Sequence, residues 1–151
     1  RGSVVPLFRK QAEQGCITVT DRRMTRFWIT LEQGVRFVLK CIERMQGGEI
    51  FVPDIPSCSI MDLAQLLAPD CKVEEIGIRP GEKLHEVLIS TDESRQALRL
   101  ADMFLIQPSF PWWSPSEELK GEPLSEGFSF ASNQNSRHLE SAELNTLLED
   151  C

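Results

Sequence analysis

The sequence contains no tyrosine and only two histidines, His85 and His138, among its 151 residues. Its five cysteines are widely spaced and odd in number; they are Cys16, Cys41, Cys58, Cys71 and Cys151. Disulfide frameworks and zinc sites need closely spaced or evenly paired ligands. We therefore interpret the cysteines as reduced thiols and expect no metal site.

Positive charge is also scarce, with 16 Lys and Arg against 23 Asp and Glu, a formal net charge of −7. This balance leaves no surplus to neutralise the phosphates of a duplex or to bind anionic lipid. No apolar run approaches the roughly 18 to 20 residues of a membrane span, and the amino end lacks the layout of a signal peptide. We expect a cytoplasmic protein with no nucleic-acid or membrane partner.

Phosphate-binding glycine loops are missing as well. None of the nine glycines lies in a G-x-G-x-x-G or G-x-x-x-x-G-K-[ST] pattern, so no dinucleotide loop or P-loop is present. Without tyrosine, the chain cannot supply the Tyr and Lys pair of short-chain dehydrogenases. Arg1 is not a methionine, and a helical pattern follows it almost at once. We expect residues 1–151 to form one domain cut from a longer enzyme.

Helical and extended patterns alternate along the first half of the chain. Capping residues, apolar periodicity and Gly or Pro stops predict helices between Ser3 and Gly15, Thr30 and Gly47, and Ser59 and Pro69, and later near 91–100 and from Ser141 onward. Strands are predicted over residues 16–20, 49–52, 73–78, 84–90 and 103–107, and residues 108–123 are expected to be irregular. The alternation with short connections favours an α/β fold.

The first predicted strand carries a polar face. Cys16, Thr18 and Thr20 point to one side of it, and Ile17 and Val19 point to the other. The hydroxyl row is therefore expected to face something other than the core.

Two arginine-centred segments, residues 21–28 and 78–86, each follow a predicted strand. Ligands of α/β sheets gather at the carboxyl ends of strands, where an arginine can bind a phosphate through two parallel hydrogen bonds. A diphosphate or a nucleotide would fit there. The alternative is that Arg23 and Arg26 are solvated surface charges and that residues 79–81 form only a tight turn. Spacing alone does not decide between these interpretations.

A series of motifs in register adds further information. They are residues 18–21 (TVTD), 23–30 (RMTRFWIT), 48–53 (GEIFVP) and 77–86 (GIRPGEKLHE). The series resembles the carboxyl-terminal half of the inverting UDP-N-acetylglucosamine 4,6-dehydratases, which belong to the extended short-chain dehydrogenase/reductase superfamily. The resemblance covers nearly the whole chain. It implies the substrate-binding portion of an NAD(P)-binding Rossmann-like fold, without the amino-terminal Rossmann core.

The resemblance also implies a reaction. In this family hydride leaves C4 of the sugar to NADP, water is eliminated across C5 and C6, and hydride returns at C6 while C5 is reprotonated with inversion. The product is a 4-keto-6-deoxy UDP-sugar for pseudaminic acid or surface polysaccharide synthesis. NADP is expected to bind mainly to the amino-terminal half, and the catalytic Asp, Lys and Tyr are expected upstream of Arg1. The full-length enzyme is expected to be a homo-oligomer.

Two alternatives to this function stay open. The first is a stand-alone, non-catalytic module that binds a nucleotide sugar or regulates another protein. The second is part of a retaining 4,6-dehydratase or of a related UDP-sugar epimerase.

Position by position, the resemblance implies a substrate site. Arg26 and Arg79 match the arginines that bind the diphosphate, and Glu82 matches an acidic residue near the ribose. Thr18 and Thr20 match the strand along the uracil, and Val5 matches a segment of the pocket wall. Met24 is a weaker candidate, His85 and Glu86 are left without a role, and Trp112 and Trp113 are expected to pack a loop against the domain.

Overall fold

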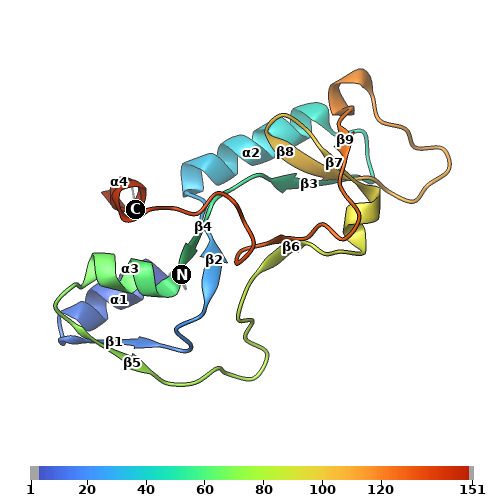
Figure 1. Ribbon diagram of the computed structural model, residues 1–151. Helices are drawn as coiled ribbons and strands as arrows, with labels where there is room; N and C mark the ends of the chain where they lie inside the picture. Colours follow the sequence, from blue (N-terminus) through green and yellow to red (C-terminus); the bar gives the residue numbers. More distant parts are fainter. Residues whose placement is uncertain (1–3, 150–151) are drawn as a thin grey trace.

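The computed structural model describes residues 4–149, and its elements gather at two ends of the molecule (Figure 1). One end contains a parallel pair of strands, β1 and β5, with helices packed beside it. Its elements are α1 (Val4–Ala12), β1 (Cys16–Val19), α3 (Ile60–Leu67), β5 (Lys72–Glu75) and α4 (Ser141–Glu149). The N-terminal helix and the C-terminal helix both pack on α3.

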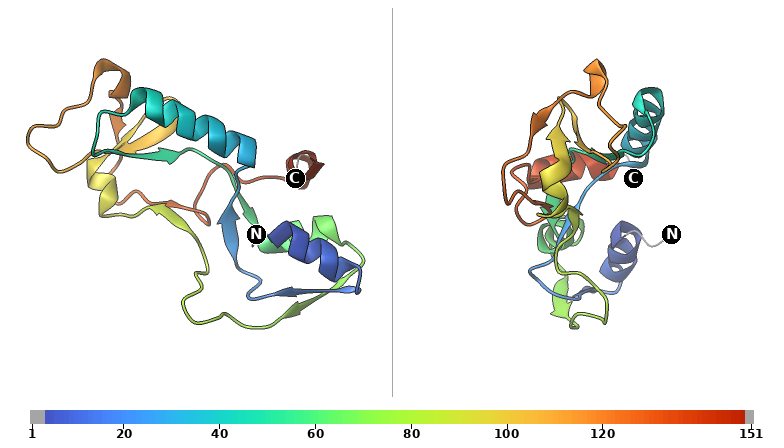
Figure 2. Two further views of the ribbon diagram at one scale, coloured as in Figure 1. Left: turned by 180° about the vertical axis from the view of Figure 1, so that it is seen from behind. Right: turned by 90° about the vertical axis from the view of Figure 1, so that its right-hand side faces the viewer.

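The other end is built on an antiparallel sheet with the strand order β3-β8-β7-β9. Helix α2 lies along one face of this sheet (Figures 1 and 2), where Phe37 packs against the apolar cluster of Leu98, Leu100, Met103, Leu105 and Leu119. The elements are α2 (Leu31–Arg44), β3 (Ile50–Pro53), β7 (Ala97–Arg99), β8 (Met103–Ile106) and β9 (Glu122–Pro123), with 3-10 turns at Glu93–Gln96 and Glu117–Leu119.

Two short antiparallel pairs lie between these ends. Strand β2 (Thr25–Phe27) pairs with β4 (Ser57–Ser59), so that Arg26 lies opposite Cys58. Strand β6 (Val87–Ile89) pairs with β10 (Phe130–Ala131). Both pairs bring segments far apart in the sequence together in the middle of the molecule.

Each end has its own apolar core. In the first, Phe8 of α1, Ile17 and Val19 of β1, Leu63 of α3 and Leu144 of α4 are buried together. The second end holds two clusters on its sheet, one of which contains Val52, Phe104 and Phe130 and the other Leu98, Leu105 and Leu119. The inward Ile17 and Val19 leave Thr18 on the other face of β1, as the alternation predicts, and Thr20 directly follows the strand and is half-buried like Thr18.

Helix α2 begins with the predicted capping box: the Thr30 hydroxyl accepts from the Gln33 amide, and the Gln33 side chain accepts from the Thr30 amide. Its apolar stripe, however, faces solvent. The stripe consists of Leu31, Val35, Val38, Leu39, Ile42 and Met45, each more than half exposed. No described residue of α2 is buried.

The mixed α/β fold is confirmed, but several elements differ from expectation. The helix predicted near 91–100 is wrong: after one 3-10 turn, residues 97–99 form β7 between β8 and β9. Pairing on both sides buries Ala97 and Leu98, and this tertiary gain outweighs local helix propensity. The strand predicted over 73–78 ends at Glu75, because its partner β1 ends at Val19. Strands β2 and β4 were not predicted.

No helix within residues 4–149 combines the length and the apolar composition that a membrane span requires. The expected cap at Ser3 lies outside the described residues.

Candidate functional site

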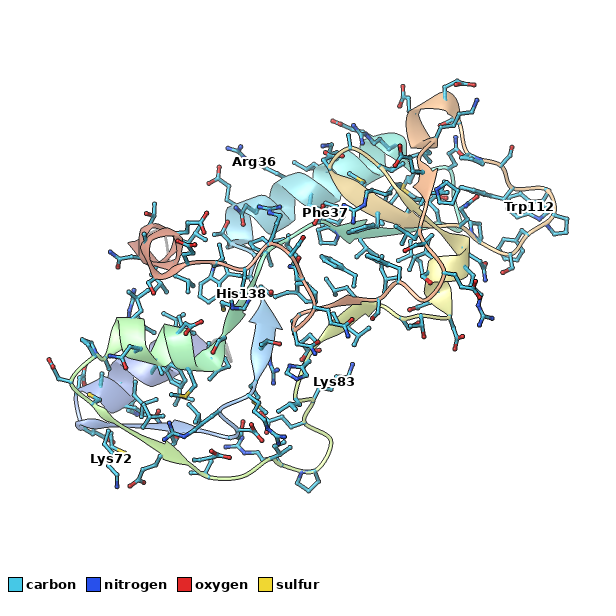
Figure 3. All side chains as sticks on the ribbon, viewed as in Figure 1. Arg36, Phe37, Lys72, Lys83, Trp112 and His138 are labelled. Carbon is cyan, nitrogen blue, oxygen red and sulfur yellow. The ribbon has the colours of Figure 1, made fainter. Side chains whose placement is uncertain are left out.

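A hollow of about 440 Å³ opens beside the carboxyl end of β1. Helix α1, strands β1 and β2 and the segment between β5 and β6 form its walls. Of the six residues predicted for the site, it brings five together: Thr18, Thr20, Arg26, Arg79 and Glu82. Apolar side chains complete the lining, namely Val4, Leu7, Phe8, Val19, Met24, Phe27, Ile60 and Ile76. In Figure 3 the labelled Lys83 marks the segment between β5 and β6, beside β2.

Thr18 is held from helix α1. The Gln11 amide nitrogen donates to the Thr18 hydroxyl at 2.7 Å, and the Thr18 backbone N–H donates to the Gln11 amide oxygen at 3.1 Å. This pair of hydrogen bonds ties α1 to β1. Gln11 has no motif of its own in the sequence, so only the three-dimensional structure reveals its role.

Glu82 links the two sides of the hollow. The Thr20 hydroxyl donates to one carboxylate oxygen of Glu82 at 3.2 Å, and the Arg79 backbone N–H donates to the other at 3.3 Å. The Glu82 N–H in turn donates to the Arg79 carbonyl at 3.0 Å. Gly81 closes this turn at a φ of 83°, a conformation that side chains disfavour. The tight turn expected at 79–81 is therefore present, and it presents Arg79 at the rim of the hollow.

The guanidinium of Arg79 is exposed and uncommitted. Within residues 4–149 it forms no hydrogen bond and no ion pair, although its backbone is fixed by Glu82. An arginine held at its backbone with all five N–H donors available can form two parallel hydrogen bonds to an anion. A phosphate group is a suitable partner.

Arg26 differs sharply from Arg79. One terminal nitrogen donates to the Thr25 and Leu84 carbonyls at 2.8 and 3.1 Å, and the other donates to the Lys83 carbonyl at 2.9 Å. The remaining nitrogen lies 3.7 Å from the Glu86 carboxylate. Arg26 is therefore no solvated surface charge, and it fastens the segment after Glu82 to β2.

Asp21 and Arg23 form an ion pair where β1 leaves the hollow. Asp21 is buried and accepts the Arg23 backbone N–H at 2.8 Å and its guanidinium at 2.7 and 3.0 Å. Hydrogen bonding to the Arg23 side chain lowers the pKa of the Asp21 carboxyl to about 2. The carboxylate stays charged and shapes the turn between β1 and β2.

Val5 does not line this hollow. Its side chain is buried in the core and borders a second hollow of about 230 Å³, whose lining also includes Arg26 and Cys58. Met24 lies in the first hollow, where its sulfur lies 2.9 Å from the Thr20 hydroxyl and is the alternative acceptor to Glu82 for the single hydroxyl proton. Ile76 also lines the hollow, and no pattern in the sequence singles it out.

Trp112 and Trp113, which were expected to pack a loop against the domain, behave differently from each other. Trp113 packs on the antiparallel sheet and its indole N–H donates to Glu49 at 3.3 Å, as expected for a loop anchor. Trp112 is 73% exposed at the outer edge of the molecule and stacks on Phe110 (Figure 3). Trp112 lies at the end of the molecule opposite the hollow (Figure 3), Trp113 packs on the sheet at that end, and neither side chain lines the hollow.

Two groups that resemble nucleophilic sites are buried. Desolvation raises the pKa of the Cys58 thiol to about 11, so it stays protonated and unreactive at neutral pH. The Ser57 hydroxyl lies 3.3 Å from Nδ1 of His138. The other ring nitrogen of His138, Nε2, lies 3.8 Å from the Asp62 carboxylate. Ser57 is fully buried, so a substrate does not reach its hydroxyl.

Comparison with known proteins places these features in context. Residues 1–108 match the model of a family described as polysaccharide biosynthesis protein. The matched range includes every residue that lines the hollow.

Curated relatives and a solved structure also match this chain. The chain is 47% and 46% identical to UDP-N-acetylglucosamine 4,6-dehydratases (inverting) from two strains of Campylobacter jejuni, with 89% and 95% of this chain matched to 43% and 46% of those proteins. It also resembles the X-ray structure of Pen from Bacillus thuringiensis, with a TM-score of 0.84 and 36% identity over 99% of this chain and 46% of that one. The chain spans about half the length of the curated relatives it matches.

Proposed function

The chain belongs to the polysaccharide biosynthesis protein family, and from this premise we propose that it is the nucleotide-sugar-binding portion of an NADP-dependent, inverting UDP-N-acetylglucosamine 4,6-dehydratase. One observation carries the proposal. The hollow beside β1 presents a free guanidinium on a fixed turn, next to a carboxylate and two strand hydroxyls. These groups suit a diphosphate, a ribose and a base.

Arg79 and Arg26, which both line the hollow, are the proposed diphosphate ligands; Arg79 contributes an uncommitted guanidinium, whereas Arg26 also binds three backbone carbonyls. Glu82 lies three residues after Arg79, on the same turn, where its carboxylate can accept from the ribose hydroxyls. Thr18 and Thr20 line the wall proposed for the uracil. Val5, behind the wall, supports it from the core.

The residues of this chain hold the substrate and leave its reacting carbons to other groups. The diphosphate is remote from C4, C5 and C6 of the hexose, so Arg79 and Glu82 bind and orient the sugar and move no proton. Binding energy from such a remote group positions the reacting atoms. The 4-keto-6-deoxy product would supply pseudaminic acid or surface polysaccharide synthesis in the cytoplasm.

The described residues do not fit the NADP that this reaction needs. A dinucleotide site has a glycine turn that leads from a strand into a helix. The described glycines with positive φ are Gly15, Gly47, Gly48, Gly77, Gly81 and Gly127, and none of them leads into a helix. NADP, which takes up and returns hydride, is therefore proposed to bind mainly to the amino-terminal portion of the enzyme.

The apolar stripe of α2 is proposed to contact that same amino-terminal portion. Four of its six exposed side chains, Leu31, Val35, Val38 and Leu39, border a groove of about 590 Å³ that is lined almost entirely by apolar residues. Exposed patches of this kind mark protein interfaces. More than half of each curated relative lies outside the match to this chain, which provides a partner of sufficient size. The complete enzyme is proposed to be a homo-oligomer.

Calorimetric titration with UDP tests the proposed function. The chain should bind UDP more tightly than uridine, because only UDP carries the diphosphate that Arg79 would bind. ADP provides the control for base recognition and should bind more weakly than UDP. A folded chain with no preference for UDP over uridine would refute the proposal.

A further inference from the structure

A buried serine beyond the family-matched residues joins both arginine-bearing segments. Ser132 follows β10, outside residues 1–108, and is fully buried. Its hydroxyl accepts the Glu86 backbone N–H at 3.0 Å, and its own N–H donates to the Glu86 carbonyl at 2.8 Å. The same hydroxyl lies 2.7 Å from the Thr25 hydroxyl and 3.1 Å from the Thr25 carbonyl. One side chain thus bridges β2 and the end of the segment that carries Arg79.

The imidazole of His85 extends this network. Its Nδ1 lies 2.8 Å from the Thr25 hydroxyl. If Nδ1 accepts, the Thr25 hydroxyl donates to it and the Ser132 hydroxyl donates to Thr25. If Nδ1 carries the proton, the direction reverses and the Ser132 hydroxyl donates to the Thr25 carbonyl. Every hydroxyl proton has a partner in both cases, so the network is complete in either tautomer.

The network contacts the residues that hold the proposed site in place. Thr25 directly precedes Arg26, whose guanidinium holds the Lys83 and Leu84 carbonyls. Glu86 ends the segment that begins with Arg79 and Glu82. The front of this segment is exposed, so the hydrogen bonds at its end add to those of Thr20 and Arg26 in placing it.

We propose that Ser132 is a positioning residue for UDP-sugar binding, acting through Thr25, His85 and Glu86 on the turn that carries Arg79. The inference rests on the proposed function. It assigns a role in substrate binding to a segment that the family model does not include. Removal of the hydroxyl leaves the Glu86 N–H without its buried acceptor and loosens the turn.

The test compares UDP with uridine in the full chain by calorimetric titration. In Ser132→Ala, the ratio of UDP affinity to uridine affinity should fall about three- to tenfold, the size expected for one lost buried hydrogen bond. Ser94→Ala is the matched control, because Ser94 is equally buried and its hydroxyl donates to the Thr91 carbonyl at the other end of the molecule. A general loss of stability would weaken both ligands equally and leave the ratio unchanged.

A second pair of variants keeps the test decisive if Ser132→Ala fails to fold. Thr25→Val removes the central hydroxyl and should lower the ratio, whereas Thr25→Ser keeps the hydroxyl and should preserve it. An unchanged ratio in folded Ser132→Ala, or in Thr25→Val, would overturn the inference. Equal affinity of the unaltered chain for UDP and uridine would instead refute the proposed function on which the inference rests.

Discussion

Replacement of Arg79 by alanine tests the proposed site at its most exposed charged group. The side chain makes no bond within the described residues, and Glu82 holds the turn through the Arg79 backbone N–H, which alanine retains. Arg79→Ala should therefore fold with unchanged thermal stability. A hydrogen bond to a charged group contributes about 1.5–3 kcal/mol, and an open rim screens the contact more than a buried pocket would. UDP affinity should fall roughly ten- to 150-fold.

Calorimetric titration with UDP measures this loss directly. Arg79→Lys should retain only part of the affinity, because an ammonium cannot form two parallel bonds to phosphate oxygens. Arg95→Ala is the matched control: Arg95 is exposed and paired with Asp92 on the 3-10 turn before β7, and its loss should leave UDP binding unchanged. Unchanged UDP affinity in folded Arg79→Ala would remove Arg79 from the site and refute the reasoning.

Three further predictions concern activity, surface and pH. The chain alone should not convert UDP-N-acetylglucosamine in the presence of NADP, since it has no tyrosine and no glycine-rich dinucleotide loop; product detected by mass spectrometry in a pure sample would contradict this. The chain should melt at low temperature and bind a hydrophobic dye, because the apolar stripe of α2 is exposed. Leu39→Lys on this stripe should reduce the dye signal without lowering the melting temperature. A high-temperature cooperative melt with no dye signal would count against this prediction. The depressed pKa of Asp21 stabilises the fold fully above its ordinary pKa, near 4, and this contribution disappears as the pH falls through about 2. The stability difference between the unaltered chain and Asp21→Asn, measured by urea unfolding, should therefore shrink from pH 5 to pH 2, and a constant difference would contradict the assignment.

Local signals in the sequence were sufficient for several elements. The capping box at Thr30 and the Ser59 cap define the starts of α2 and α3 because both depend on neighbouring residues alone. The alternation over residues 16–20 placed Thr18 on the face opposite Ile17 for the same reason. Strand β7 depends instead on partners from β8 and β9, which no local pattern reveals.

The candidate site was likewise predictable only in part. The resemblance selected five residues that the fold brings around one hollow, although their separation in the chain reaches 64 positions, from Thr18 to Glu82. It did not indicate that the terminal nitrogens of Arg26 donate to backbone carbonyls. Nor did it indicate that the Ser132 hydroxyl contacts the Thr25 hydroxyl, 107 positions away in the chain. Such contacts arise only when segments far apart in the chain meet between the two cores.

The location of bound UDP is the most direct test of the account. Backbone amide NMR spectra recorded during a UDP titration should show the largest shifts at Thr20, Arg79 and Glu82, around the hollow beside β1. The exposed stripe of α2 and the Trp112 loop should not respond. Shifts confined to those distant surfaces, or a folded chain with no response at Arg79 and Glu82, would contradict the claim that this hollow holds the diphosphate of a UDP-sugar.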